Sequence, residues 1–169
     1  TILPVKEFEE DRFIVTATAK GIIKKTALMA YSNPRAGGII ALTIDEGDCL
    51  IEARLTDGKR DLLLATRNGK SIRFPEANVR SMGRPARGVR GMTLDGDDEI
   101  VSLQSVTENT SLALVTVTEN GYGKRTDIGE YRVQSRGGKG IITIKTSERN
   151  GKVVAIKMVD EDSDLMFIT

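Results

Sequence analysis

The sequence of 169 residues contains no histidine, no tryptophan and a single cysteine, Cys49. Without histidine there can be no Ser-His-Asp triad, no Cys-His pair and no histidine-containing metal site. One cysteine excludes an internal disulfide and a thiolate metal cluster, and it fits a reducing cytoplasm. A Walker-type phosphate loop and a dinucleotide-binding glycine fingerprint are also missing. We therefore predict a chain that carries no catalytic residues, metal ions or cofactors of its own.

Long hydrophobic runs are absent as well. No apolar stretch approaches the roughly 18 residues that span a bilayer, and residues 1–10 lack the basic start and apolar stretch of a signal peptide. We therefore expect no membrane partner. The chain does not start with methionine, which indicates a piece of a longer protein. Aromatic residues make up only 4% of it, so its core must consist of aliphatic side chains.

Glycine is frequent, with 17 residues, and it marks an internal repeat. Three units align: residues 12–57, 61–106 and 112–160. Each unit opens with a short apolar or alternating run and reaches a turn that ends in glycine. These turn glycines are Gly21, Gly69 and Gly121. Because glycine adopts positive φ angles without steric cost, each opening predicts a β-hairpin.

The remainder of each unit follows the same order. A glycine-rich basic loop ends at Gly38, Gly88 or Gly140, and a strand is predicted directly after it, over 39–44, 89–94 and 141–144. A polar or acidic turn and a closing β-rich run over 50–55, 100–106 and 153–159 complete the unit. Helical structure is expected only as single turns over 26–31 and 75–80.

The turn glycines are 48 and 52 residues apart, and a period of about 50 with four short strands is typical of a propeller blade. We predict an all-β, propeller-like fold with four-stranded blades and about three complete repeats of a larger ring. Residues 1–11 would then end a preceding blade and 164–169 would start the next. A β-sandwich is the alternative, but it does not account for the regular recurrence.

The net charge of +1 is uninformative because the sum hides where charges lie. Basic residues are concentrated between the hairpin turn and the end of the glycine-rich loop, over 20–38, 67–90 and 119–140. These stretches hold 16 of the 25 basic residues and four of the 24 acidic ones. The acidic residues follow the loops, at 45–48 and 95–99. In a radial arrangement of blades, the basic stretches would form one stripe suited to a long polyanion.

This stripe predicts non-specific binding of duplex DNA, in which Lys and Arg neutralise phosphates while the DNA bends. The candidate DNA-binding residues are Lys24, Lys25, Arg35, Lys70, Arg73, Arg80, Arg84, Arg87, Arg90, Lys124, Arg125, Arg132, Arg136 and Lys139. Tyr31, Val79 and Tyr131 share one repeat position, for which we expect a packing role rather than base stacking. Solvated charged loops without a partner are the alternative for any single loop.

The third loop carries a resemblance to a known family. Its sequence is Gln134, Ser135, Arg136, Gly137, Gly138, Lys139 and Gly140. It resembles the Gln-Arg-Arg-Gly-Gly-Lys-Gly box in the C-terminal domain of the A subunit of DNA gyrase, from which it differs at Ser135. The strings 2–8, 79–91, 120–126 and 146–151 are also similar to this family, so the likeness covers essentially the whole chain.

The resemblance implies a β-pinwheel of about six blades that binds and bends duplex DNA around its outer rim. This wrapping lets gyrase, an ATP-dependent type II topoisomerase, introduce negative supercoils. The implied partners are duplex DNA, the rest of the gyrase A subunit, and the gyrase B subunit in an A2B2 holoenzyme, in the bacterial cytoplasm and on the nucleoid. ATP, Mg²⁺ and the DNA-cleaving tyrosine are used elsewhere in the holoenzyme, so this chain has no catalytic role of its own.

One departure limits what the resemblance implies. In the family the intact box lies in the first blade, whereas residues 134–140 lie in the third repeat and are expected to be a degenerate copy. We therefore expect the chain to bind and bend DNA without completing a wrap alone. The alternatives are the corresponding domain in the A subunit of topoisomerase IV and a protein-interaction propeller without a nucleic-acid role.

Overall fold

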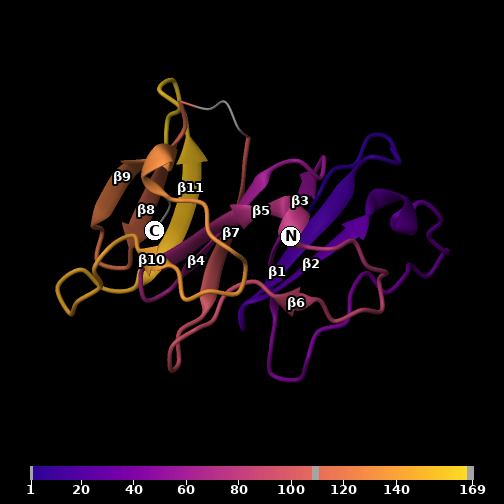
Figure 1. The fold of residues 1–169 in the computed structure, drawn as a ribbon, viewed down its shortest axis with the longest axis horizontal. Coiled ribbons are helices and arrows are strands. Elements are labelled where there is room, and N and C mark those ends of the chain that lie inside the picture. Colours follow the sequence, from indigo (N-terminus) through magenta and orange to yellow (C-terminus); the bar gives the residue numbers. More distant parts are fainter. Residues whose placement is uncertain (1, 108–110, 167–169) are drawn as a thin grey trace.

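The computed structural model describes residues 2–107 and 111–166, and its regular secondary structure consists of β-strands and short 3-10 turns (Figure 1). Its strands are β1 (Phe13–Thr18), β2 (Ile22–Ala27), β3 (Leu50–Thr56), β4 (Asp61–Thr66), β5 (Lys70–Pro75), β6 (Val89–Arg90), β7 (Ile100–Val106), β8 (Ala113–Thr118), β9 (Gly123–Asp127), β10 (Ile141–Ile142) and β11 (Val153–Val159). Short 3-10 turns follow the second strand of each hairpin: η1 (Leu28–Tyr31), η2 (Glu76–Asn78) and η3 (Ile128–Glu130). No helix in the described ranges is long and apolar enough to cross a membrane.

The strands form three antiparallel sheets, in the orders β3-β1-β2-β6, β10-β5-β4-β7 and β11-β8-β9. The three predicted hairpins are confirmed as β1-β2, β4-β5 and β8-β9. They share one register, in which Val15 lies opposite Lys25, Leu63 opposite Arg73 and Val115 opposite Arg125. The predicted all-β fold is therefore confirmed, and two of the three sheets in the described residues have four strands.

The outermost strand of a sheet comes from the following repeat. β6 belongs to the second repeat by sequence but pairs with β2 of the first, with Val89 opposite Ile23. β10 belongs to the third repeat and pairs with β5 of the second, with Ile141 opposite Ser71. Each exchange ties two neighbouring repeats together by backbone hydrogen bonds. In the described part of the chain, the third sheet has three strands, and β9 forms one of its two edges, at the place that β6 and β10 cover in the other two sheets.

The pairing of β6 and β10 with the preceding repeat differs from the strands predicted after the loops. The prediction over 39–44 is wrong, because these residues form no strand. Those over 89–94 and 141–144 shrink to the two residues each of β6 and β10. A strand at this position requires the hairpin of the preceding repeat as its partner, and the described residues before the first repeat, 2–11, hold no strand. Ile40 is accordingly 77% exposed.

The third 3-10 turn, η3, was not predicted, although it lies at the same repeat position as the other two. At the ends of the chain, residues 2–11 and 163–166 hold no strand. The predicted start of a further blade over 164–169 lies partly outside the described residues.

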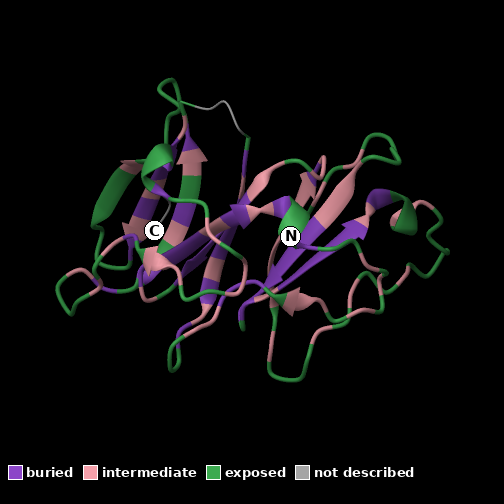
Figure 2. Cartoon of the chain, in the orientation of Figure 1, coloured by how far each residue is buried: buried purple, intermediate pink, exposed green. Residues whose placement is uncertain are grey.

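The core consists of two mainly aliphatic clusters with β4 between them, and each also contains one buried aromatic residue, Phe74 in the first and Tyr131 in the second. Leu62 and Leu64 face one cluster, together with residues of the first hairpin, and Leu63 faces the other, together with residues of the third repeat. Successive side chains of a strand point to opposite faces, so β4 is covered on both sides, and Figure 2 shows that the strand is buried along most of its length. This accounts for its uninterrupted leucine run where a strand with one solvated face would alternate.

The acidic residues after the loops hold the hairpin turns of their own repeat. Asp48 Oδ1 accepts the backbone N–H of Lys20 at 2.9 Å, and Asp98 Oδ1 accepts that of Asn68 at 2.8 Å. Both carboxylates also accept the N–H of the next residue along the chain, at 2.8 and 2.9 Å. The repeat phase of these acids therefore has a structural cause.

Candidate nucleic-acid interface

The second and third glycine-rich loops lie along the outer edge of the preceding sheet. Residues 79–90 run alongside β2 in space. Met82 donates its N–H to the carbonyl of Lys25 at 2.9 Å, and the end of the loop pairs with β2 as β6. Residues 131–142 run alongside β5 in the same way. Gln134 donates its N–H to the carbonyl of Arg73 at 2.8 Å, and the end of the loop pairs with β5 as β10. Two successive loops thus occupy equivalent places on two successive sheets.

Arginine side chains link each loop to the loop of the repeat before it. Arg84 Nη1 donates to the carbonyl oxygen of Ile40 at 2.9 Å. Arg136 stands at the same repeat position and donates to the carbonyl oxygen of Arg90, which corresponds to Ile40. Counted back from the loop glycines, both arginines lie four residues before Gly88 and Gly140. The first loop has Pro34 at this place.

A second recurring link joins a basic residue to the first acid of the preceding acidic turn. Arg87 Nη1 lies 3.0 Å from Asp45 Oδ1, and Lys139 Nζ lies 2.8 Å from Asp95 Oδ1. Asp95 also pairs with Lys70, at 2.6 Å. A hydrogen bond from Lys139, which has the largest effect, and a second from Lys70 lower the pKa of Asp95 from 3.8 to about 2. The Asp95 carboxylate in turn raises the pKa of Lys139.

Two basic residues at one hairpin position connect blades instead of facing solvent. Lys25 is 7% exposed, and its Nζ donates to the carbonyl oxygen of Glu76 in η2 at 3.2 Å. Arg73 occupies the same register in the next hairpin and donates to the carbonyl oxygen of Ile128 in η3 at 3.0 Å. A salt bridge of 2.8 Å to Asp61 also holds Arg73. We assign Lys25 and Arg73 to these contacts between blades.

Lys24 is buried as well, and its Nζ donates to the carbonyl oxygen of Arg84. Burial, and then the charge of Arg84, lower the pKa of Lys24. Arg125, by contrast, stands at the register position of Lys25 and Arg73 but is exposed, as is its neighbour Lys124.

The other candidate residues lie at or near the surface. Lys70, Arg84 and Arg136 are half-buried. The exposed ones are Arg35, Arg80, Arg87, Arg90, Lys124, Arg125, Arg132 and Lys139. Among the described residues, Arg80 and Arg132 form no salt bridge with an acid, and they stand at one repeat position, directly after Val79 and Tyr131. Val79 and Tyr131 are buried, as expected for loop support.

The loop that resembles the box is docked by its backbone. Gly137 donates its N–H to the carbonyl of Gly91 at 2.8 Å, and Thr93 donates its N–H to the carbonyl of Gly138 at 2.9 Å. Gly140 has φ +72°, and a Cβ at this residue would lie 2.2 Å from the carbonyl oxygen of Ser71. Glycine is therefore required here because the loop closes against β5. Ser135 is exposed.

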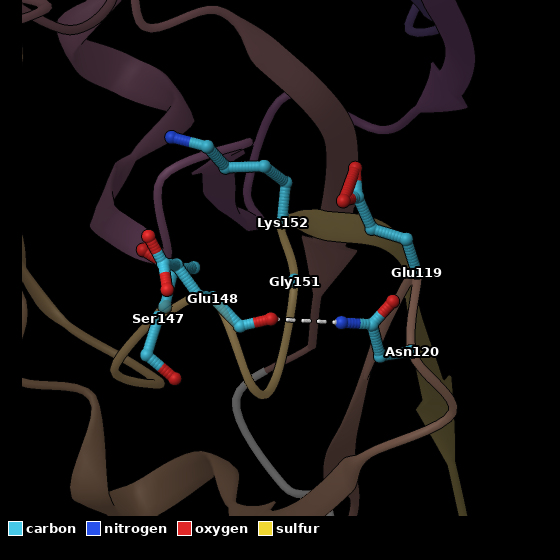
Figure 3. A pocket seen from close by; sticks show the side chains of 7 residues that line it. Glu119, Asn120, Ser147, Glu148, Gly151 and Lys152 are labelled. Atoms are coloured by element: carbon cyan, nitrogen blue, oxygen red, sulfur yellow. Dashed lines mark hydrogen bonds between the residues drawn. The ribbon is translucent and has the colours of Figure 1, made fainter.

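A pocket of 350 Å³ lies beside the turn of the third hairpin (Figure 3). Asn120 Nδ2 donates to the carbonyl oxygen of Glu148 at 3.1 Å, which joins two of the residues that line the pocket. Lys152 Nζ donates to Oδ1 of Asn68 in the second repeat. These polar groups hold the turn together. Within the ranges described, no group of three or more His, Cys, Asp or Glu side chains could hold a metal ion.

The chain matches a known protein family over most of its length. The profile of the family described as "DNA gyrase C-terminal domain, beta-propeller" matches residues 12–57, 60–107 and 113–160. The A subunit of DNA gyrase from Salmonella typhimurium is 49% identical over 168 residues, which are 99% of this chain and 19% of that protein. The corresponding gyrase protein of Staphylococcus aureus is 46% identical over 170 residues, which are 100% of this chain and 19% of that protein.

Two solved structures share the fold. The C-terminal domain of DNA topoisomerase IV superimposes with a TM-score of 0.87, and the DNA gyrase A C-terminal domain with one of 0.83, each at 28% identity. The superpositions cover 94% of this chain and 50% and 52% of the two domains. The chain thus spans about half of either domain and about a fifth of the gyrase relatives. The family profile and the relatives at 46–49% identity show that the chain belongs to the DNA gyrase C-terminal domain family.

Proposed function

We propose that this chain binds and bends duplex DNA along its outer edge, as part of a gyrase A subunit that introduces negative supercoils. One observation carries the proposal: successive glycine-rich loops lie at equivalent places on successive sheets and expose Arg80 and Arg132 at one repeat position. A phosphate backbone that passes from sheet to sheet would meet the same basic groups at each step.

Phosphate contacts of this kind carry no base code. Arginine and lysine neutralise phosphates and release counterions, so affinity depends steeply on salt and weakly on sequence. Preference among sequences would follow the ease with which the duplex bends. Lys24, Lys25 and Arg73 hold the sheets and loops together and therefore support this surface without contacting DNA.

The role in the whole protein rests on its relatives. We propose that the chain works with the rest of the gyrase A subunit, and with the gyrase B subunit, in an ATP-dependent type II topoisomerase on the nucleoid in the cytoplasm. DNA cleavage and ATP hydrolysis would then take place outside this chain. Because the loop 134–140 differs from the family's box at Ser135, we expect binding and bending here, and a complete wrap only with the remaining blades.

Titration of a labelled duplex tests the proposal. Fluorescence anisotropy at rising salt should show tight binding at low salt, a steep linear fall of log K with log salt, and similar affinities for unrelated sequences. An absence of duplex binding at low salt would overturn the proposal and favour a propeller that contacts proteins.

A further inference from the structure

Asp95 lies between two lysines that come from different repeats. Its Oδ2 accepts from Lys70 Nζ at 2.6 Å, and its Oδ1 accepts from Lys139 Nζ at 2.8 Å. The side chains of Lys70, Lys139 and Asp95 are 32%, 67% and 46% exposed. Each carboxylate oxygen thus serves one ammonium group, in a site that is open to solvent.

The backbone positions of both lysines are fixed independently of Asp95. Lys70 lies in β5 directly opposite Ile142 of β10. Lys139 lies in the loop that Thr93 anchors, through its N–H to Gly138 and its Oγ1 to the carbonyl of Gly137 at 2.7 Å. Without the carboxylate, both side chains would still extend from these fixed backbone positions, and neither would have another acid among its described ion-pair partners.

A phosphodiester offers the same kind of acceptor as the Asp95 carboxylate, namely two oxygens that share one negative charge. Exposed ion pairs contribute at most about 1 kcal/mol, so a phosphate that is held by neighbouring contacts can displace Asp95. We propose that Lys70 and Lys139 form a site for a backbone phosphate of duplex DNA, and that Asp95 occupies this site in the free protein and thereby weakens DNA binding. The inference rests on the proposed function, which it deepens.

The first repeat contains a weaker version of this site. Asp45 corresponds to Asp95 and pairs with Arg87, but Ile22 stands where the second repeat has Lys70. The depressed pKa of Asp95 agrees with two engaged cations at the second site. Removing the carboxylate should therefore free two cations at Asp95 and one at Asp45.

The test compares Asp95→Asn with Asp97→Asn in the full chain, by duplex affinity over a salt series. Asp97 is exposed in the same acidic turn and forms no ion pair with a described residue, so the two variants change the net charge equally. We expect Asp95→Asn to raise affinity at low salt by roughly threefold to tenfold, since one unit charge about 4 Å away in water is worth about 1 kcal/mol. Asp97→Asn should raise it by less than about twofold.

A second variant separates the site from a general change of charge. Adding Lys70→Gln and Lys139→Gln to Asp95→Asn should abolish the gain, and circular dichroism should show that each variant keeps its strands. An affinity of Asp95→Asn equal to or below that of Asp97→Asn would overturn the inference while wild-type binding persists. If neither wild type nor variants bind duplex DNA at low salt, the proposed function itself fails.

Discussion

The basic residue in the middle of each hairpin's second strand does not have the same role in every repeat. Lys25 and Arg73 reach backbone carbonyls in the 3-10 turn of the next repeat, whereas Arg125 at the same register is exposed. From the sequence, all three fit a basic rim equally well. The sequence cannot separate them, because the partners Glu76 and Ile128 are about fifty residues away and meet them only in the folded protein.

This difference predicts unequal costs for the same substitution. Arg73→Gln removes the salt bridge to Asp61 and the link to η3, in a setting where the Arg73 and Asp61 side chains are only 14% and 17% exposed. It should lower the free energy of unfolding by about 2 to 4 kcal/mol. Arg125→Gln, the matched control, should change it by less than about 0.5 kcal/mol. Urea denaturation measures both, and equal effects would contradict the assignment of Arg73 to the contact between blades.

The Asp95 carboxyl predicts a measurable titration. Because its pKa of about 2 lies below the ordinary 3.8, its ion pairs stabilise the fold above about pH 4, and this contribution is lost as the pH falls through about 2. A ¹³C NMR titration of the carboxyl should give a midpoint near 2. In the Lys70→Gln/Lys139→Gln variant the midpoint should return towards 3.8. A wild-type midpoint near 3.8 would show that the lysines do not hold the carboxylate.

Among the elements, local signals were predictable and distant pairings were not. The hairpins β1-β2, β4-β5 and β8-β9 follow from apolar runs and turn glycines within a few residues of one another. β6 and β10 pair with the hairpin of the preceding repeat. The sequence pattern within a single repeat does not indicate this partner. The burial of Glu76 could not be predicted either. Glu76 is fully buried at the repeat position where the other two repeats have Leu28 and Ile128. Its Oε1 accepts from Thr56 at 2.6 Å.

The strand exchange predicts that two similar glycines tolerate alanine differently. Gly38 and Gly140 both close a loop with positive φ, at +81° and +72°, but only Gly140 is packed against another strand. Gly38→Ala should cost about 1 kcal/mol, from backbone strain alone. Gly140→Ala should cost at least about 2 kcal/mol more, because the added Cβ meets the carbonyl of Ser71 and pushes β10 off β5. Thermal unfolding measures the difference, and equal losses would contradict the docking of this loop.

In the whole molecule, acidic and basic residues recur at fixed positions of the repeat because both are tied to structural contacts that recur with it. The acids Asp48 and Asp98 are in phase because they hold the hairpin turns, and the loops are in phase because β6 and β10 anchor them to the preceding sheet. The repeat and the concentration of basic residues in one phase could be predicted from the sequence. Which basic groups remain open to a polyanion could not, because burial of Lys24 and Lys25 depends on the exchanged loops.

The central claim, that exposed basic groups of the loops neutralise DNA phosphates, is tested most directly by the salt dependence of duplex affinity. The triple variant Arg80→Gln/Arg90→Gln/Arg132→Gln removes three exposed arginines of the loops and of β6. The control Lys6→Gln/Lys59→Gln/Lys157→Gln removes the same charge from exposed residues outside the three basic stretches. We predict that the slope of log K against log salt becomes shallower by about 3 in the first variant, at roughly 0.9 per lost phosphate contact, and changes by less than about 1 in the control. An unchanged slope in the arginine variant, or an equal change in both, would contradict the account.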